Sequence, residues 1–153
     1  MHSRIFQVNT KPIKEEDYIS ESDYWEHWFT NEIADYVTES DDRDEDIKWL
    51  KDCQKGYTVG NDDNGYYIVV TSKTEYFHSA FQRFKEVFNS IKDCTIEHFI
   101  SGIHEIWSLK NAYEDKFGFY VDTNGELMTF DSFIRYCDEG DKYYIGGTID
   151  YHC

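Results

Sequence analysis

Residues 56–75 read G-Y-T-V-G-N-D-D-N-G-Y-Y-I-V-V-T-S-K-T-E, and this one short run contains signals for both kinds of secondary structure. Aromatic and β-branched residues at 57–59 and 66–71 flank a turn of Asn, Asp and Gly, which is typical of a β-hairpin. Ser72 and Glu75 then form a capping box, which predicts that a helix begins directly after the hairpin. A hairpin that leads into a helix indicates an α+β fold.

The helix after Glu75 has the strongest periodicity in the chain. Its apolar residues recur at spacings of three and four, and they are Phe77, Ala80, Phe81, Phe84, Val87, Phe88 and Ile91. A second helix is predicted from Thr95, with Ile96, Phe99, Ile100, Ile103, Ile106, Trp107 and Tyr113 on its buried side. We expect both helices to pack on the sheet.

The amino-terminal side of this region predicts one strand and two further helices. Residues 5–8 form a short apolar run that fits a strand. Ser22 is a candidate cap for a helix whose apolar residues extend from Tyr24 to Val37 at helical spacing. The acidic stretch that follows opens the next helix.

The carboxyl-terminal side predicts a second hairpin, a short helix and a last strand. Asn124-Gly125 marks the turn of the hairpin, residues 130–137 form the helix, and residues 143–151 form the strand. A bulge is expected at Gly146-Gly147. The prediction is therefore an antiparallel or mixed sheet, built from two hairpins and a C-terminal strand, with about four to five helices packed on one face of it.

Composition is consistent with a single domain over residues 1–153. The chain has one proline and no Gly/Ser-rich linker, and its 13 Tyr, 11 Phe and 4 Trp supply bulky core side chains. The four cysteines, Cys53, Cys94, Cys137 and Cys153, form no C-x-x-C pair, so we expect free thiols. We find no signal-peptide h-region and no apolar run long enough to span a membrane, and we expect a cytoplasmic protein.

The charge is strongly negative and unevenly spread. The formal net charge is -16; residues 1–63 carry 17 acids and 7 bases, residues 64–113 carry 5 and 5, and residues 114–153 carry 9 and 3. Such a field repels nucleic acid and anionic membranes, and it attracts basic proteins. Direct binding of nucleic acid is therefore not expected.

The densest acidic run lies in residues 38–49, T-E-S-D-D-R-D-E-D-I-K-W. Asp41 or Asp42 can cap a helix that places Asp44, Glu45 and Asp46 in its first turn. Gly56 stands where the C-terminal cap is expected. Helix initiation explains only part of the run. A calcium loop is excluded by position, because the places that an EF-hand gives to its glycine and its bidentate glutamate hold Ile47 and Cys53.

Signals for catalysis are weak. None of the six histidines is in an H-x-x-x-H or H-E-x-x-H arrangement, and no serine or cysteine has a nucleophile motif. Glu97 and His104 are seven residues apart and share a helical face, so they could join a metal site if another carboxylate approached. We expect no cofactor, and the sequence leaves catalysis open as the less favoured hypothesis.

The leading prediction is a non-catalytic interaction protein whose acidic face binds a basic partner. The candidate partner-binding residues are Asp35, Glu39, Asp41, Asp42, Asp44, Glu45, Asp46 and Trp49, with Asp138, Glu139 and Asp141 as an extension of the face. Small acidic proteins that occupy the DNA sites of restriction enzymes, nucleases or repressors share this charge, so DNA mimicry is the most specific form of the prediction. The resemblance is one of composition and rests on no motif.

Two alternatives come from other classes of protein. One is a small metal-dependent hydrolase that uses Glu97, His104 and Glu105. The other is a structural protein that dimerises when its Tyr-rich strands pair edge to edge. The oligomeric state is not determined by the sequence.

Overall fold

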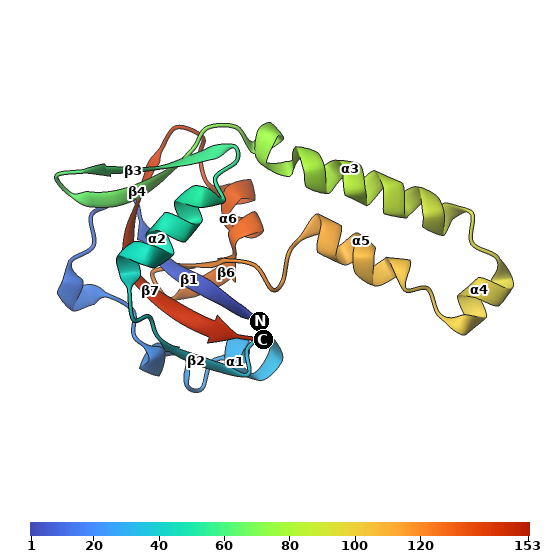
Figure 1. Cartoon of the computed structure of the whole chain (residues 1–153), viewed down its shortest axis with the longest axis horizontal. Helices are drawn as coiled ribbons and strands as arrows, with labels where there is room; N and C mark the ends of the chain where they lie inside the picture. The colour runs from blue at the N-terminus through green and yellow to red at the C-terminus, as the bar shows by residue number, and fades with distance from the viewer.

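The computed structural model describes all 153 residues and has an α+β fold built on one seven-stranded mixed sheet (Figure 1). The strands are β1 (His2–Asn9), β2 (Tyr36–Glu39), β3 (Tyr57–Asp62), β4 (Gly65–Val70), β5 (Tyr120–Thr123), β6 (Glu126–Thr129) and β7 (Lys142–His152). The helices are α1 (Trp28–Glu32), α2 (Arg43–Asp52), α3 (Lys73–Lys92), α4 (Ile96–Ser101), α5 (Glu105–Tyr113) and α6 (Phe130–Tyr136). Short 3-10 helices, η1 and η2, occupy Glu15–Asp17 and Glu21–Tyr24. The predicted fold class is confirmed.

The long strand β7 organises the sheet. The strand order is β3-β4-β7-β1-β5-β6, and β2 pairs with the same side of β7 as β4 does, at the other end of that strand. The first residues of β7 pair with β4, and its last residues, from Ile149 to His152, pair with β2. β1 and β5 run parallel and every other pair is antiparallel, so the sheet is mixed. The Tyr-rich strands β4 and β7 each have neighbours on both sides, so neither offers a free edge for the edge-to-edge dimer considered above.

The predicted bulge at Gly146-Gly147 is confirmed, and it changes which face of the sheet β7 buries. Phe6 of β1 faces Thr148 and Val8 faces Ile145, so β7 has one residue more than β1 between these pairs. The side chain of Gln7, the β1 residue opposite the bulge, accepts a hydrogen bond at Oε1 from the amide of Gly147 at 2.9 Å. The extra residue shifts the alternation of side chains by one.

Helices and short turns cover both faces of the sheet, whereas we expected helices on one face only, and each face has its own hydrophobic core. The larger core joins α2 and α6 to the sheet through residues such as Phe6, Leu50, Phe133 and Ile145. The smaller core lies under η2 and α1 and contains Ile149 among its buried residues. In a regular strand Ile145 and Ile149 would share a face, so the bulge is what allows β7 to contribute to both cores.

Local sequence signals located most element ends correctly. The side chain of Ser72 accepts a hydrogen bond from the amide of Glu75 at 3.1 Å at the start of α3. Asp42 caps α2 in the same way, with Asp44, Glu45 and Asp46 in the first turn. Both hairpins, the helix α6 and the strands β1 and β7 also lie where they were predicted. Gly56 is not a helix cap: α2 ends at Asp52, and Gly56 instead precedes β3 with a φ of 69°.

Two predicted helices are wrong in extent. The helix expected from Ser22 to Val37 is divided into η2, α1 and the strand β2, because Tyr36 and Val37 pair with the end of β7. The helix expected from Thr95 is divided into α4 and α5. Gly102 separates them with a φ of 101°, a conformation that a helix does not contain.

The expectation that α3 and its successor pack on the sheet is also wrong. Figure 1 shows α3, α4 and α5 extending together away from the sheet as a helical arm. We use "the arm" for residues 73–113 and "the body" for the rest. α3 and α4 bury no residue fully, and α5 buries only Ala112. The apolar stripes of these helices are therefore largely outside the core of the body.

Candidate functional site

The acidic run predicted from the sequence forms part of a polar pocket at the start of α2. The pocket has a volume of about 200 Å³ and contains no hydrophobic side chain. Its lining residues come from β1, from β2 and the turn after it, from the first turn of α2 and from β7, and they are Arg4, Thr38, Glu39, Ser40, Asp41, Asp42, Glu45, Asp46 and Asp150. We call it the acidic pocket. Five of the eight predicted site residues meet there.

An ion-pair network forms the floor of the acidic pocket. Asp46 is 3 % exposed, and its carboxylate accepts hydrogen bonds from Nε of Arg4 and, at 2.7 Å, from the hydroxyl of Thr148. Arg4 also donates from Nη1 to Asp150 at 2.6 Å. Asp46 therefore supports the pocket from within. It is too buried to be part of a surface that contacts a macromolecule, and we remove it from that surface.

Arg43, the base that stands between the acids of the run, is not part of the pocket lining. Its Nε and Nη2 donate to the carbonyl oxygens of Gly146 and Ile145 at 2.6 and 2.8 Å. Its guanidinium also lies over the rings of Tyr18 and Tyr66. Arg43 thus holds the start of α2 against the bulge of β7. Among the neighbouring acids it pairs only with Asp44, at 3.9 Å.

The rim of the acidic pocket consequently carries carboxylates without basic partners. Glu39, Asp41, Asp42 and Glu45 are all exposed, and none of them forms a salt bridge within the chain. Asp42 has a structural role as well, because its Oδ1 accepts a hydrogen bond from the amide of Glu45 at 3.0 Å. The remaining three side chains have no hydrogen bond within the chain. This arrangement suits a cationic group brought by another molecule.

The other predicted residues lie outside the acidic pocket. Asp44 is exposed beside Arg43, and Asp35 contacts Nδ1 of His152 at 3.2 Å near the end of β7. The run of Asp138, Glu139 and Asp141 lies between α6 and the start of β7, whereas the pocket uses the other end of that strand. The proposed extension of the acidic face is therefore not continuous with the pocket.

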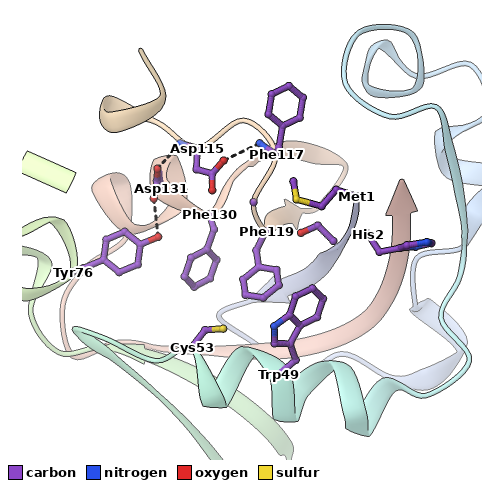
Figure 2. Close-up of a pocket in the computed structure, with 12 residues that line it drawn as sticks. Met1, His2, Trp49, Cys53, Tyr76, Asp115, Phe117, Phe119, Phe130 and Asp131 are labelled. Carbon is purple, nitrogen blue, oxygen red and sulfur yellow. Dashed lines mark hydrogen bonds between the residues drawn. The ribbon is translucent and has the colours of Figure 1, made fainter. Parts of the chain in front are cut away.

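Trp49 belongs to a second pocket, which is shown in Figure 2. This aromatic pocket has a volume of about 320 Å³, and its rings are those of Trp49, Tyr76, Phe117, Phe119 and Phe130. Asp131 lies at one side, where it accepts hydrogen bonds from the hydroxyl of Tyr76 at 2.7 Å and from the amide of Asp115 at 2.8 Å. The cavity is large enough for one bulky apolar side chain.

The two pockets are neighbours. The guanidinium of Arg4, which forms part of the acidic pocket, lies 5.4 Å from the centre of the Trp49 ring. The ring of Trp49 also lies edge to face with the ring of Phe119, with 4.9 Å between the ring centres. The contact between Arg4 and Trp49 therefore joins the acidic pocket to the aromatic one.

The residues proposed for a metal site do not assemble. Glu97 lies in α4 and His104 precedes α5, with the break at Gly102 between them, so they do not share a helical face. Glu105 contacts His98 instead, at 3.5 Å between Oε2 and Nε2. No three His, Cys, Asp or Glu side chains are grouped as metal ligands in this structure.

The sequence reasoning missed Arg4 and Asp150. They are far apart in the chain, and only the antiparallel pairing of β1 with β7 places them opposite one another. An arginine directly before the apolar residues Ile5 and Phe6 is the one signal that could have indicated a buried carboxylate partner.

Comparisons with known proteins give no family. No protein-family model, no curated protein and no solved structure matches the chain. None of the helices has the length and apolar character needed to cross a membrane.

Proposed function

We propose that the protein is a non-catalytic interaction module that binds a basic protein through the acidic pocket. The observation that carries the proposal is the set of carboxylates at the rim, Glu39, Asp41, Asp42 and Glu45, which have no basic partner in the chain. An arginine or lysine of a partner would supply the missing charge, and hydrogen bonds between charged groups are stronger than neutral ones. The net charge of -16 would also accelerate the approach of a basic protein.

The aromatic pocket gives the proposed interaction a second anchor. Because Arg4 of the acidic pocket lies against Trp49 of the aromatic pocket, a partner that places a basic side chain in the first can place a bulky apolar side chain in the second. Buried aromatic contacts commonly carry much of the binding energy of an interface, whereas charges at the rim contribute more to specificity and to the rate of association. The pair of pockets therefore favours a specific partner over general attraction to positive charge.

The partner class that we propose is a nucleic-acid-binding protein. Such proteins bind duplex DNA through its phosphates, which present about one charge per 1.7 Å of helix axis. A rim of closely spaced carboxylates also presents negative charges close together, so the chain would occupy the nucleic-acid site of its partner. Bound partner should then be displaced by duplex DNA.

The test compares two variants with equal loss of charge. The pocket variant combines Glu39→Gln, Asp41→Asn and Glu45→Gln, whose side chains make no hydrogen bond within the chain. The matched control combines Asp63→Asn, Glu86→Gln and Glu126→Gln, which are also exposed and lie outside both pockets. Asp42 and Asp46 stay unchanged because each supports the fold.

Affinity capture from cell lysate at low and moderate salt identifies the partner, and calorimetric titration of that purified partner measures the affinity. We expect the control to bind as the wild type does and the pocket variant to lose most of the affinity. Equal weakening of both variants would reduce the interaction to general charge attraction and refute the pocket as the site. Displacement of the bound partner by duplex DNA decides whether the chain acts as a DNA mimic.

A further inference from the structure

The arm is held rigidly at its root, although it packs on little else. Asp131 of α6 accepts hydrogen bonds both from Tyr76 at the start of α3 and from Asp115 just after α5. The guanidinium of Arg135 lies 4.6 Å from the ring centre of Phe77 and 4.1 Å from that of Tyr113. Both ends of the arm are therefore fixed to one helix, and the arm extends from the body in a defined direction (Figure 1).

The arm exposes more apolar surface than its own two-helix packing can cover. α5 packs along α3 and half-buries Ala80, Phe84 and Val87. Phe81 and Phe88 lie seven residues apart on the adjoining side of α3, and each remains more than half exposed. Ile106 and Tyr113 repeat this arrangement on α5, at 44 % and 56 % exposure. Each helix thus has an apolar stripe that is wider than contact with a single neighbour requires.

The exposed sides of α3 and α5 face the same groove. The groove has a volume of about 290 Å³ near the root of the arm, and it is lined by Phe77, Ala80, Phe81, Phe84, Ala112, Tyr113 and Arg135. At the opposite end, the short helix α4 exposes Ile96, Phe99 and Ile100 by 64 %, 65 % and 77 %. The arm therefore combines an apolar groove at its root with an apolar knob at its tip.

Charge separates the arm from the rest of the molecule. The arm contains five acids, Glu75, Glu86, Asp93, Glu97 and Glu105, and five bases, Lys73, Arg83, Lys85, Lys92 and Lys110. It is therefore neutral, and the whole net charge of -16 lies on the body. Two copies of this chain repel one another wherever their bodies meet, but their arms can approach without that cost.

We propose that the arm is a dimerisation element that packs antiparallel on the arm of a second copy, with the tip of each in the root groove of the other. The contact is symmetric, and α3 and α5 of both copies form a four-helix bundle, in which every helix has two neighbours. This arrangement covers the wide stripes of both helices. It also places the two bodies at opposite ends of the bundle.

The area and the separation of charge both fit this arrangement. Seven side chains would be covered, namely those of Phe81, Phe88, Ile96, Phe99, Ile100, Ile106 and Tyr113. A large apolar side chain exposes roughly 200 Å² when free, and these seven are 44 % to 77 % exposed, so their exposed area is roughly 800 Å² per chain. This is about the area per partner of a stable interface. The 20 residues of α3 span about 30 Å. The bodies would thus lie about three Debye lengths apart at ~0.1 M salt.

The test uses one substitution at each end of the arm. Phe81→Lys changes the root groove and Ile100→Glu changes the tip, and both side chains are exposed in the monomer, so neither change affects the core. The matched control is Trp25→Lys in the body, at a side chain that is 69 % exposed. Circular dichroism confirms that each variant is folded. Sedimentation equilibrium over a wide range of protein concentration measures the dimer.

We expect the wild type and the control to reach twice the chain mass, and each arm variant to raise the dimer dissociation constant at least ~100-fold, because two unpaired charges then enter an apolar interface. An equimolar mixture of the two variants should dimerise again, since a mixed dimer keeps one native contact and gains one Lys–Glu contact. A wild type that stays monomeric at every concentration would overturn the proposal. Dimerisation that the arm variants leave unchanged, or that mixing does not restore, would also overturn it.

Discussion

Replacing Asp46 by alanine should destabilise the protein far more than replacing Asp44, although both acids lie in the first turn of α2. Asp44 is largely exposed, and its removal costs the favourable interaction with the helix dipole, about 0.3–1 kcal/mol. Asp46 is buried and bonded to Arg4 and Thr148. Each substitution removes one negative charge, so the net charge of the two variants is equal.

The expected magnitude for Asp46→Ala follows from its two partners. Breaking a buried ion pair by removing one member costs about 3–5 kcal/mol. Arg4 keeps its contact with Asp150, which reduces this cost, whereas the buried hydroxyl of Thr148 loses its acceptor, which adds to it. We therefore expect a loss of about 2–4 kcal/mol in the free energy of unfolding, or a fall of about 5–12 °C in Tm for a chain of this size.

Urea unfolding of the wild type and both variants, followed by tryptophan fluorescence and circular dichroism, measures the difference. The transition of Asp44→Ala should stay close to that of the wild type, with Asp46→Ala shifted to clearly lower urea and an unchanged slope. If the two variants unfold at the same urea concentration, then Asp46 is one more surface acid and the division of the acidic run described here is wrong.

Three further perturbations test the fold. In urea unfolding, Gly56→Ala should lower the free energy of unfolding by more than Gly140→Ala does. Both glycines have positive φ, but a Cβ at Gly56 would collide with the main chain of Ser72 and Tyr76, whereas a Cβ at Gly140 would face open space. Burial raises the pKa of the Cys137 thiol to about 11, so at neutral pH a thiol reagent should modify exposed Cys53 in the native protein and Cys137 only after unfolding, as peptide mapping would show. Burial acts to raise the pKa of Glu114, but hydrogen bonds from two hydroxyls outweigh burial and lower this pKa. The ionised Glu114 therefore stabilises the folded state at pH values above the ordinary glutamate pKa, and this stabilisation is lost as the pH falls through the lowered pKa. Glu114→Gln should consequently make the free energy of unfolding depend less steeply on pH in the acid range.

Local signals predicted most of the fold. The caps at Asp42 and Ser72, the turn at Asn124-Gly125 and the bulge at Gly146-Gly147 depend on residues that are adjacent in the chain, and all four are confirmed. The predictions that were wrong concern segments whose structure is set by contacts with residues far away in the chain. Residues 36–39 have apolar spacing that also suits a helix, but pairing with β7 makes them a strand, as the aromatic and β-branched side chains favour.

The same distinction holds for the candidate site. The acids at the rim of the acidic pocket are neighbours in sequence, so the run T-E-S-D-D-R-D-E-D was enough to locate them. The ion-pair network at the floor of the pocket forms only when β1 pairs with β7, and the periodicity of the sequence does not predict that pairing. The burial of Asp46 and the orientation of Arg43 likewise depend on partners more than a hundred residues away.

The helical periodicity also led to the wrong prediction that the helices of the arm pack on the sheet. An apolar stripe shows that a helix has a buried face, but it does not show whether the same chain or another one covers that face. α3 has a strong stripe and buries none of its residues fully. The sequence therefore predicted the helix correctly and its environment incorrectly.

We propose that the rim of the acidic pocket binds cationic side chains as a defined site. The most direct measurement is an NMR titration of the isotope-labelled protein with an arginine-rich peptide, in parallel with the pocket variant at Glu39, Asp41 and Glu45. We expect saturable amide shifts centred on residues 38–46, absent from the variant and present in the matched control. Shifts spread over all acidic segments without saturation, and alike in the three proteins, would show that the rim is not a defined binding site.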